Sequence, residues 1–535
     1  MPHRTSQRPG ASWLAGAAPA FGLILGALWL AHLPLLRLPY FWDEAGYFIP
    51  AARDLLLTGD LIPHTTLSNA HPPLVMLWLA LVWKLLGYSV LVTRTAMLLV
   101  AAWGLTALWL MGRRVAGRAT ATAAVLLTAL SPTVFSQAAM AQLDIAAFAL
   151  VLWTLYAHIC GKHWQAAALA ALAAVAKETT VAVTLTLAGM ELLGWIAFRW
   201  RPRPADKWCL PRPRLAQCAA YVAALLPLVG WYAYHFHRTG HVFGNPDYLR
   251  YNVGATVTPW RILIALWMRL WHATGYMNLF VLTWPALLLW WSGRKTSAQT
   301  TEVNAAGIPS NIQLLFALVV LAQVAEFSVV GGALLARYMI PAIPLVVLMA
   351  VDVLRRQAPH WPWWIAGCAA TFVAALLLNP PWFISPEDNL TWTHFVAMHQ
   401  SAARYVEQHY AEDRILTAWP ASDELNRPFL GYVEKPLTVV RAENFTAEEM
   451  LRAAQQPENF DVVVAFSTKY TPPRSLLPHI AGWTRAQTRY FDFHEDLKAA
   501  AIARMLHGRV VWQESSPGEW IAVIEIDKVR EARKF

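Results

Sequence analysis

The chain has 535 residues, of which 57% are hydrophobic and only 14% are charged. Soluble domains carry about 25% charged residues, so this composition excludes a disordered chain and argues against a fully soluble enzyme. Residues 1–379 contain 26 Lys and Arg against 12 Asp and Glu, whereas residues 380–535 contain 17 against 21. Because the positive charge belongs to the apolar part, basic inner loops of a membrane protein explain it better than nucleic-acid binding.

Eleven apolar runs are candidate membrane spans, since a span needs about 17–25 residues, and somewhat fewer where an end is buried in protein. The first run continues past Ala15–Ala20, a stretch that faintly resembles a cleavage site, so we predict an uncleaved anchor. The predicted spans are Ala15–Leu36, Arg94–Met111, Ala119–Phe135, Ile145–Cys160, Trp164–Ala176, Thr180–Phe198, Leu215–His235, Tyr276–Trp291, Ile312–Val330, Tyr338–Leu354 and Trp363–Leu378.

A further apolar run, Leu74–Leu86, is too short to span and contains Lys84. If it does not cross and the N-terminus is cytoplasmic, every dense basic cluster lies on the inner side, as the positive-inside rule requires. We therefore predict that this run is an interfacial helix. The resulting topology is a multi-pass protein of the inner (cytoplasmic) membrane, with a cytoplasmic N-terminus, a large outer loop over residues 37–93 and an extracytoplasmic C-terminal domain.

Residues 380–535 differ in kind from the membrane domain of residues 1–379. A helical pattern over Thr393–Tyr410 precedes short β-rich runs, with helical stretches such as Ala447–Ala454 between some of them. This alternation predicts a small α/β domain on the outer side. The β-rich runs are Arg414–Ala418, Leu437–Val440, Asp461–Ser467, Arg509–Glu514 and Trp520–Ile526.

Charged residues are expensive to bury in a membrane, so their concentration at one face indicates a site. In the predicted topology they gather at the outer face. Asp43 and Glu44 directly follow the first span, within Phe41–Tyr47. A carboxylate beside an apolar surface serves well as a general base. Alternatively, Asp43 caps the helix that follows, and the two roles can also be divided between Asp43 and Glu44.

Two further outer-face residues each allow two interpretations. His71 precedes Pro72-Pro73 and the interfacial helix; it either binds a phosphate or faces water. Asp144 is an isolated acid in apolar sequence. It either caps a helix or meets Asp43 across a cavity.

Two cationic residues of the outer face also allow two interpretations each. Lys177 interrupts a long apolar stretch; it is either neutralised by Glu178 or offers its charge to a phosphate. Arg337-Tyr338 opens the tenth span, where the arginine either snorkels to the surface or recognises phosphate.

The metal signal is weak. His237 and His241 have the i, i+4 spacing of a helical metal pair, but Gly240 between them disfavours helix. No cofactor is indicated with certainty, and a divalent metal stays open. Glu191, near an inner helix end, is predicted to be structural.

Taken in chain order, these residues resemble a known family. The features are Asp43-Glu44 after an uncleaved first span, Pro72-Pro73 before an interfacial helix, and Gly87–Arg94 opening the second span, followed by Asp144, Lys177 and Arg337–Pro341. The order resembles the GT-C superfamily of polyprenyl-phosphate-sugar glycosyltransferases, in particular the bacterial protein O-mannosyltransferase, aminoarabinose transferase and lipopolysaccharide-core transferase group. The resemblance covers about residues 15–380.

The resemblance implies a fold and a site. Asp43 would be the catalytic carboxylate with Glu44 beside it, and Asp144 the second acid. Arg94, Lys177 and Arg337 would bind the donor phosphate or shape the cavity, with His71 and Tyr338 as further candidates. One departure is that aminoarabinose transferases carry an acidic-basic pair before the two prolines, where this chain has Ala70-His71. That departure argues against the same substrate.

The implied reaction is transfer of a sugar, with inversion, from a polyprenyl phosphate to a hydroxyl of a glycan, lipid or protein acceptor at the outer membrane surface. Asp43 would take the acceptor proton. A transporter or lipid flippase is the alternative, but it predicts repeats and charges near the midplane, and the sequence shows neither. A non-catalytic scaffold is a third interpretation.

Overall fold

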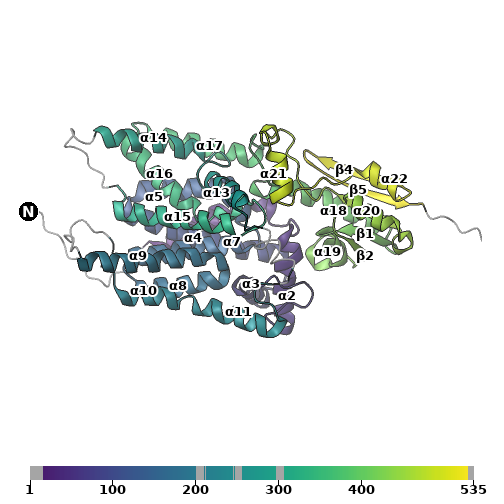
Figure 1. Cartoon of the computed structure of the whole chain (residues 1–535), viewed down its shortest axis with the longest axis horizontal. Coiled ribbons are helices and arrows are strands. Elements are labelled where there is room, and N and C mark those ends of the chain that lie inside the picture. Colours follow the sequence, from purple (N-terminus) through teal and green to yellow (C-terminus); the bar gives the residue numbers. More distant parts are fainter. Residues whose placement is uncertain are drawn as a thin grey trace, which may run out of the picture.

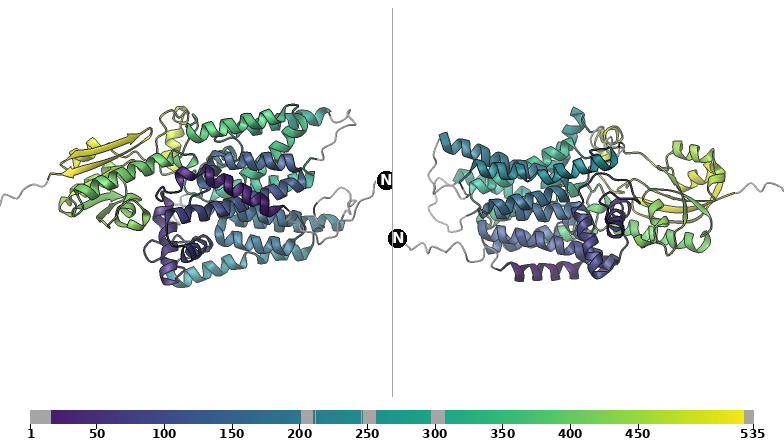
Figure 2. Two further views of the ribbon diagram at one scale, coloured as in Figure 1. Left: turned by 180° about the vertical axis from the view of Figure 1, so that it is seen from behind. Right: turned by 90° about the horizontal axis from the view of Figure 1, so that it is seen from below.

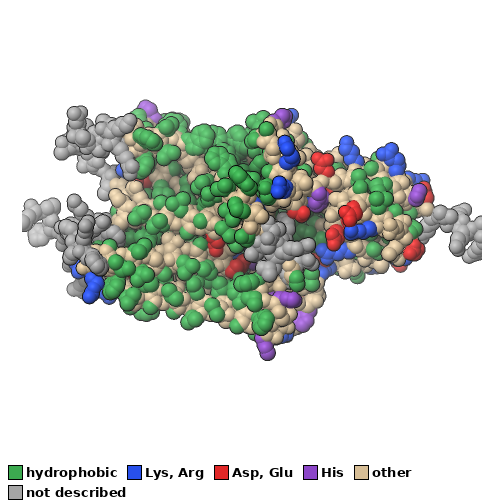
Figure 3. Space-filling view, in the orientation of Figure 1, with side chains coloured by type: hydrophobic (Ala, Val, Ile, Leu, Met, Phe, Trp, Pro, Cys, Tyr) green, Lys and Arg blue, Asp and Glu red, His purple; other side chains and the backbone are tan. Residues whose placement is uncertain are grey.

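The computed structural model describes residues 16–200, 210, 212–244, 246, 256–296 and 307–527. Long helices form one part of the molecule, and a five-stranded sheet with its helices forms the other (Figure 1). Hydrophobic side chains cover most of the helical part in Figure 3, whereas charged side chains gather over the part that contains the sheet. An apolar surface around a helix bundle is the one expected in contact with lipid.

Each predicted apolar span coincides with one helix or with consecutive helices. The helices of this part are α1 (Ala17–Ala31), α2 (Ile49–Thr58), α3 (Leu74–Leu86), α4 (Val90–Val115), α5 (Arg118–Leu130), α6 (Pro132–Gln137), α7 (Leu143–Ile159), α8 (His163–Ala176), α9 (Val181–Trp200), α10 (Leu215–Ala223), α11 (Leu226–Thr239), α13 (Pro259–Thr274), α14 (Phe280–Thr296), α15 (Ser310–Val329), α16 (Ile343–Gln357) and α17 (Trp361–Leu377).

The number of membrane crossings is smaller when judged by helix length and composition. Among the described residues, four helical stretches are long and apolar enough to cross: Val90–Val115, Glu178–Arg199, Leu215–Thr239 and Ser310–Val329. The predicted count of eleven is therefore not confirmed. The predicted cytoplasmic N-terminus and most of the basic loop within Arg199–Arg214 lie outside the described residues.

Helix α3 has the predicted bounds and, with α2, lies at the end of the helical part next to the sheet (Figure 2). Helix α13 was not predicted. It carries Arg261 and Arg269 among its apolar residues, and both arginines are buried. They donate to the carbonyls of an irregular segment, Gly331–Leu335: Arg261 Nη2 lies 2.5 Å from the oxygen of Gly331, and Arg269 Nη1 lies 2.7 Å from that of Leu335. Backbone carbonyls that are buried outside regular secondary structure need such partners.

The sheet confirms the predicted strand positions. Its order is β2-β1-β3-β5-β4, with β1 parallel to β2 and β3, and β5 antiparallel to β3 and β4. Strand β3 is central and completely buried, as its run of apolar residues requires. The strands are β1 (Arg414–Ala418), β2 (Thr438–Ala442), β3 (Val462–Phe466), β4 (Gly508–Ser516) and β5 (Glu519–Ile526); the helices are α18 (Trp392–His409), α19 (Ala421–Asn426), α20 (Ala447–Ala454), α21 (Trp483–Tyr490) and α22 (Ala499–Met505).

Aromatic side chains join the two parts. The ring of Trp42, from the first outer loop, lies 5.4 Å from that of Phe395 and 5.3 Å from that of Trp419. Gly46 permits this packing, because a Cβ atom there would lie only 2.3 Å from Nε1 of Trp419. We call Trp42, Phe395 and Trp419 the aromatic junction. It fixes the first outer loop against the sheet part, and thereby one wall of the candidate site.

Candidate active site

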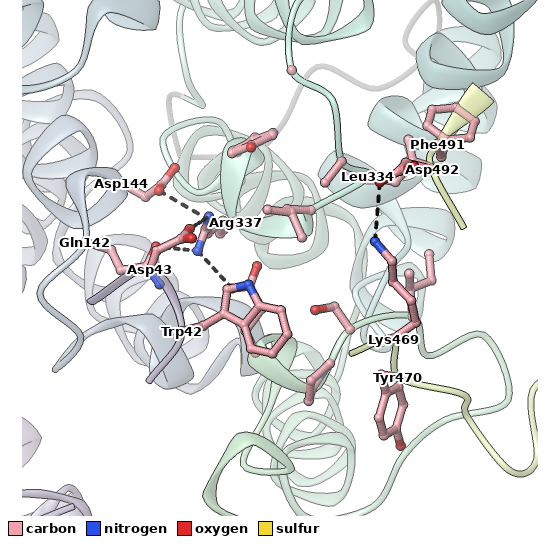
Figure 4. Close-up of a pocket in the computed structure, with 18 of the residues that line it drawn as sticks. Trp42, Asp43, Gln142, Asp144, Leu334, Arg337, Lys469, Tyr470, Phe491 and Asp492 are labelled. Carbon is pink, nitrogen blue, oxygen red and sulfur yellow. Dashed lines mark hydrogen bonds and ion pairs between the residues drawn. The ribbon is translucent and has the colours of Figure 1, made fainter. Parts of the chain in front are cut away.

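A cavity of about 1230 Å³ lies where the helical part meets the sheet part. The first outer loop, the start of α7, the segment after α8 and the end of α15 form its helical side. The linker before α18 and loops of the sheet part form the other side (Figure 4). Six of the residues singled out from sequence line it: Asp43, His71, Asp144, Lys177, Arg337 and Tyr338.

Arg337 is the centre of the charged cluster in this cavity. Its Nη2 lies 2.5 Å from Oδ2 of Asp43, its Nη1 lies 2.8 Å from Oε2 of Glu387, and its Nε lies 3.7 Å from Oδ2 of Asp144. Arg337 also donates to the side chain of Gln142. The side chain is buried and does not snorkel. Segments far apart in the sequence therefore meet on one guanidinium (Figure 4).

Lys177 pairs with Asp144, and not with its neighbour Glu178. Its Nζ lies 2.5 Å from Oδ1 of Asp144 and 4.6 Å from the centroid of the Tyr338 ring. Glu178 instead approaches His71, whose Nδ1 lies 3.1 Å from Oε2. Of the two interpretations of Lys177, the neutralising pair with Glu178 is therefore wrong, and the contact with a phosphate stays a prediction. Lys177 combines an ion pair with a cation–π contact inside the cavity.

The capping interpretation of the two acids is also wrong. Asp43 precedes the short helix Glu44–Phe48, yet its side chain makes no capping hydrogen bond. Asp144 lies inside the first turn of α7, where Gln142 occupies the N-cap position. Both carboxylates turn instead toward the cluster around Arg337, as an encounter of Asp43 and Asp144 in a cavity requires.

Glu44 and Arg94 lie behind the cavity wall. Oε1 of Glu44 is 2.6 Å from Nη1 of Arg94 and 2.6 Å from the amide nitrogen of Ala141. Its Oε2 accepts from the amide of Phe41 at 3.0 Å. Both side chains are completely buried, and neither residue lines the cavity. Their pairing holds the wall from behind. The roles of Glu44 beside the catalytic acid, and of Arg94 in binding the donor phosphate or shaping the cavity, stay predictions.

The proposed histidine metal pair is not assembled. His237 lies in the last turn of α11, which ends at Thr239, and Gly240 has a left-handed φ of 76°. Both His237 and His241 are exposed, and no group of three potential ligands among the described residues includes either of them. Among the described residues that line the cavity, no three potential ligand atoms lie within 4.8 Å of one another.

Several cavity residues were missed by the sequence reasoning. Glu387 follows the last predicted span by a few residues, and burial raises the pKa of its carboxyl to about 8. Glu519 opens β5, is buried in the cavity wall and has a pKa raised to about 8 by the same cause. Lys469 approaches Asp492 at 3.7 Å on the sheet side of the cavity (Figure 4). Only Glu387 carried a usable signal, as an acid at the outer end of a span.

No family model matches the sequence, and no curated protein matches it. The fold is similar to the crystal structure of ArnT from Cupriavidus metallidurans bound to undecaprenyl phosphate, with 15% identity, a TM-score of 0.53 and coverage of 95% of this chain and 98% of that one. The apo structure of the same protein matches with 16% identity, a TM-score of 0.54 and coverage of 96% and 98%.

The likeness extends over both the helical part and the sheet part. The chain therefore shares the fold of ArnT. With its candidate spans and apolar surface, this fold indicates a membrane-embedded protein.

Proposed function

We propose that the protein is an inverting glycosyltransferase that moves a sugar from a polyprenyl-phosphate donor to an acceptor hydroxyl at the outer surface of the inner membrane. The observation that carries this proposal is the joining of Asp43, Lys177 and Arg337 in one cavity at the boundary between an apolar helix bundle and a polar domain. The undecaprenyl phosphate in the ArnT structure of similar fold supports a polyprenyl phosphate as the carrier.

Asp43 is the proposed general base. Its side chain is 21% exposed, whereas those of Asp144 and Glu387 are each 5% exposed. The most accessible of the three carboxylates is therefore the one that an acceptor hydroxyl reaches. Arg337 orients it through Oδ2 at 2.5 Å. A positioned base contributes about 10²–10⁴ in rate.

The reaction is a single displacement. The acceptor oxygen bonds to the anomeric carbon as its proton passes to Asp43, and the bond from that carbon to the phosphate oxygen breaks with its electron pair. The polyprenyl phosphate leaves as a monoester and needs cationic stabilisation, not a proton. Lys177 and Arg337 supply this charge, and His71 lies on the same cavity wall.

The cluster offers cations to a lipid phosphate. Lys177 and Arg337 are its two cations, and Asp43, Asp144 and Glu387 surround them. A phosphate diester that enters the cluster replaces an internal contact of a cation with one of its own.

The two parts of the chain have different proposed roles. Residues 1–379 form the membrane domain that binds the lipid carrier, with the outer loop of about residues 37–93 as part of the catalytic wall. Residues 380–535 form an extracytoplasmic domain that closes the cavity opposite the membrane. The sheet-side residues Lys469 and Glu519 line the space that an acceptor occupies.

The test is a transfer assay with the purified full-length protein in lipid. A panel of radiolabelled polyprenyl-phosphate sugars is supplied with total envelope extract, for the wild type, Asp43→Asn and Asp60→Asn. Asp60 is the matched control, an outer-loop carboxylate whose Oδ2 lies 2.6 Å from an arginine, Arg238, outside the cavity.

Label that moves to a glycan, lipid or protein with the wild type and Asp60→Asn, and at least about 100-fold more slowly with Asp43→Asn, supports the proposal. If Asp43→Asn transfers label at the wild-type rate, Asp43 is not the general base. If the folded wild type transfers no label but moves the lipid across vesicle membranes, the protein is a flippase and the proposal fails.

A further inference from the structure

A second polar cluster lies at the other end of α7, far from the cavity. It consists of His158 in the last turn of α7, His163 at the start of α8, and Glu191 in α9. Fourteen residues separate Asp144 from His158 along α7, which at the helical rise is about 21 Å. The cluster is therefore remote from the proposed reaction.

The three side chains converge without hydrogen-bonding one another. Nδ1 of His158 lies 3.9 Å from Oε1 of Glu191, and Nδ1 of His163 lies 3.7 Å from the same oxygen. Hydrogen bonds of this kind measure about 2.7–3.2 Å, so both separations are too long. One potential ligand atom from each residue lies within 4.8 Å of the others.

The polar groups of His163 remain unsatisfied in this arrangement. All three side chains are buried, and both ring nitrogens of His163 lack a hydrogen-bond partner. A buried polar atom without a partner is unfavourable, and a buried carboxylate needs a compensating charge. A single divalent cation between the three side chains supplies a bond to each.

The spacing fits such an ion. Ligands at about 2.0–2.1 Å from a tetrahedral zinc ion are about 3.3–3.5 Å apart. The two distances from the histidine nitrogens to Glu191, 3.9 Å and 3.7 Å, need to shorten by a few tenths of an ångström, and the two histidine ligand atoms lie within 4.8 Å of each other. Nδ1 of His158 is hydrogen-bonded to the Tyr221 hydroxyl at 2.8 Å. When this nitrogen binds the ion, the hydroxyl is placed to bind a coordinated water.

We propose that His158, His163 and Glu191 form a structural Zn²⁺ site. Two imidazoles and one carboxylate are a donor set that zinc accepts readily. Mg²⁺ and Ca²⁺ prefer oxygen ligands only, so the two imidazoles disfavour them. The ion joins the ends of α7 and α8 to α9 and, through Tyr221, to α10. It ties four helices together without taking part in sugar transfer.

The first experiment measures metal content. The full-length protein is purified in detergent with a histidine-free affinity tag, dialysed against micromolar zinc and then against buffer, and analysed by mass spectrometry of the elements. We expect about one zinc per chain for the wild type and for His237→Ala, an exposed-histidine control, and less than a fifth of that for His163→Phe and Glu191→Gln. No bound zinc in the wild type, or equal zinc in the variants, overturns the site.

The second experiment distinguishes a metal-binding His163 from a buried histidine that binds no metal. Phenylalanine at position 163 removes two buried unpaired nitrogens, so without a metal His163→Phe leaves the unfolding temperature unchanged or raises it. If the wild type binds zinc, His163→Phe unfolds at a lower temperature than the zinc-loaded wild type. Chelation then lowers the unfolding temperature of the wild type but not that of the variant. Co²⁺ in place of zinc gives the visible absorption of a tetrahedral N/O site in the wild type alone. These measurements do not depend on sugar transfer.

Discussion

Asp43 and Glu44 are adjacent in sequence, but replacing each acid by its amide should have a different effect. We expect Glu44→Gln to lower stability and Asp43→Asn to lower sugar transfer. The Glu44 carboxylate accepts from Arg94 and the amide of Ala141 through Oε1, and from the amide of Phe41 through Oε2. A glutamine offers one oxygen, so one of these donors faces an NH₂ group. Arg94 is completely buried and is left without its charge partner. Breaking a buried pair in this way costs about 3–5 kcal/mol.

The assay compares stability and turnover for both variants. Thermal unfolding in detergent, followed by intrinsic fluorescence, should show a fall on the order of 10 °C for Glu44→Gln. The molecules that remain folded should retain wild-type turnover. Asp43→Asn should unfold within a few degrees of the wild type and lose transfer, because Arg337 retains Glu387 at 2.8 Å.

A double variant provides the control. Glu44→Gln with Arg94→Met removes both charges, so it should recover part of the stability lost in Glu44→Gln alone. If Glu44→Gln instead unfolds like the wild type and loses turnover, the base role belongs to Glu44, and the separation of the two acids drawn from their burial is refuted.

Three further predictions concern the cavity. Lys177→Met should lower kcat about 10²–10³-fold because the leaving phosphate loses a cation, and Lys177→Arg should recover part of it in the same assay. Burial raises the pKa of Glu519 to about 8 from its ordinary value of 4.5, so the folded state binds a proton that the unfolded state releases. The free energy of unfolding therefore falls as pH rises from about 4.5 to about 8; melting curves at pH 5, 7 and 9 should show a flatter dependence for Glu519→Gln. Gly46→Ala places a methyl group against Trp419 and should slow transfer while leaving expression in the membrane unchanged, whereas Gly230→Ala, at a site with nothing within 4 Å, should have no effect.

Helices and strands were predictable where the spacing of apolar residues in the sequence matches the residues that the fold buries. The sheet is an example, because each strand is a short run rich in β-branched and apolar residues between turn residues. Helix α13 was missed for the opposite reason. Arg261 and Arg269 interrupt its apolar pattern, and only the tertiary structure shows the carbonyls that accept from them. The number of membrane crossings was the hardest feature to predict, because several apolar helices are shorter than a bilayer requires.

Part of the membership of the site was predictable, but the pairing of its side chains was not. Sidedness brought Asp43, Asp144, Lys177 and Arg337 to one face, and all four line the cavity. Sequence spacing could not show that Asp43 turns toward Arg337, 294 residues away, while Glu44 turns inward to a different arginine. Such choices depend on backbone direction at a few residues, and one of these, Trp42, has a φ of 48°.

The segment Gly331–Leu335 decides which walls of the cavity can move. Its carbonyls bond to two buried arginines of α13, so displacing it toward lipid would leave both the carbonyls and the guanidinium groups without partners. This wall therefore shifts together with α13 or stays in place. The facing side, beside the aromatic junction, is also held by hydrogen bonds between the two parts: the Tyr432 hydroxyl donates to the oxygen of Tyr40 at 2.9 Å, and Arg427 donates to the oxygen of Thr65. Hydrogen bonds to backbone carbonyls therefore hold both walls of the cavity in place.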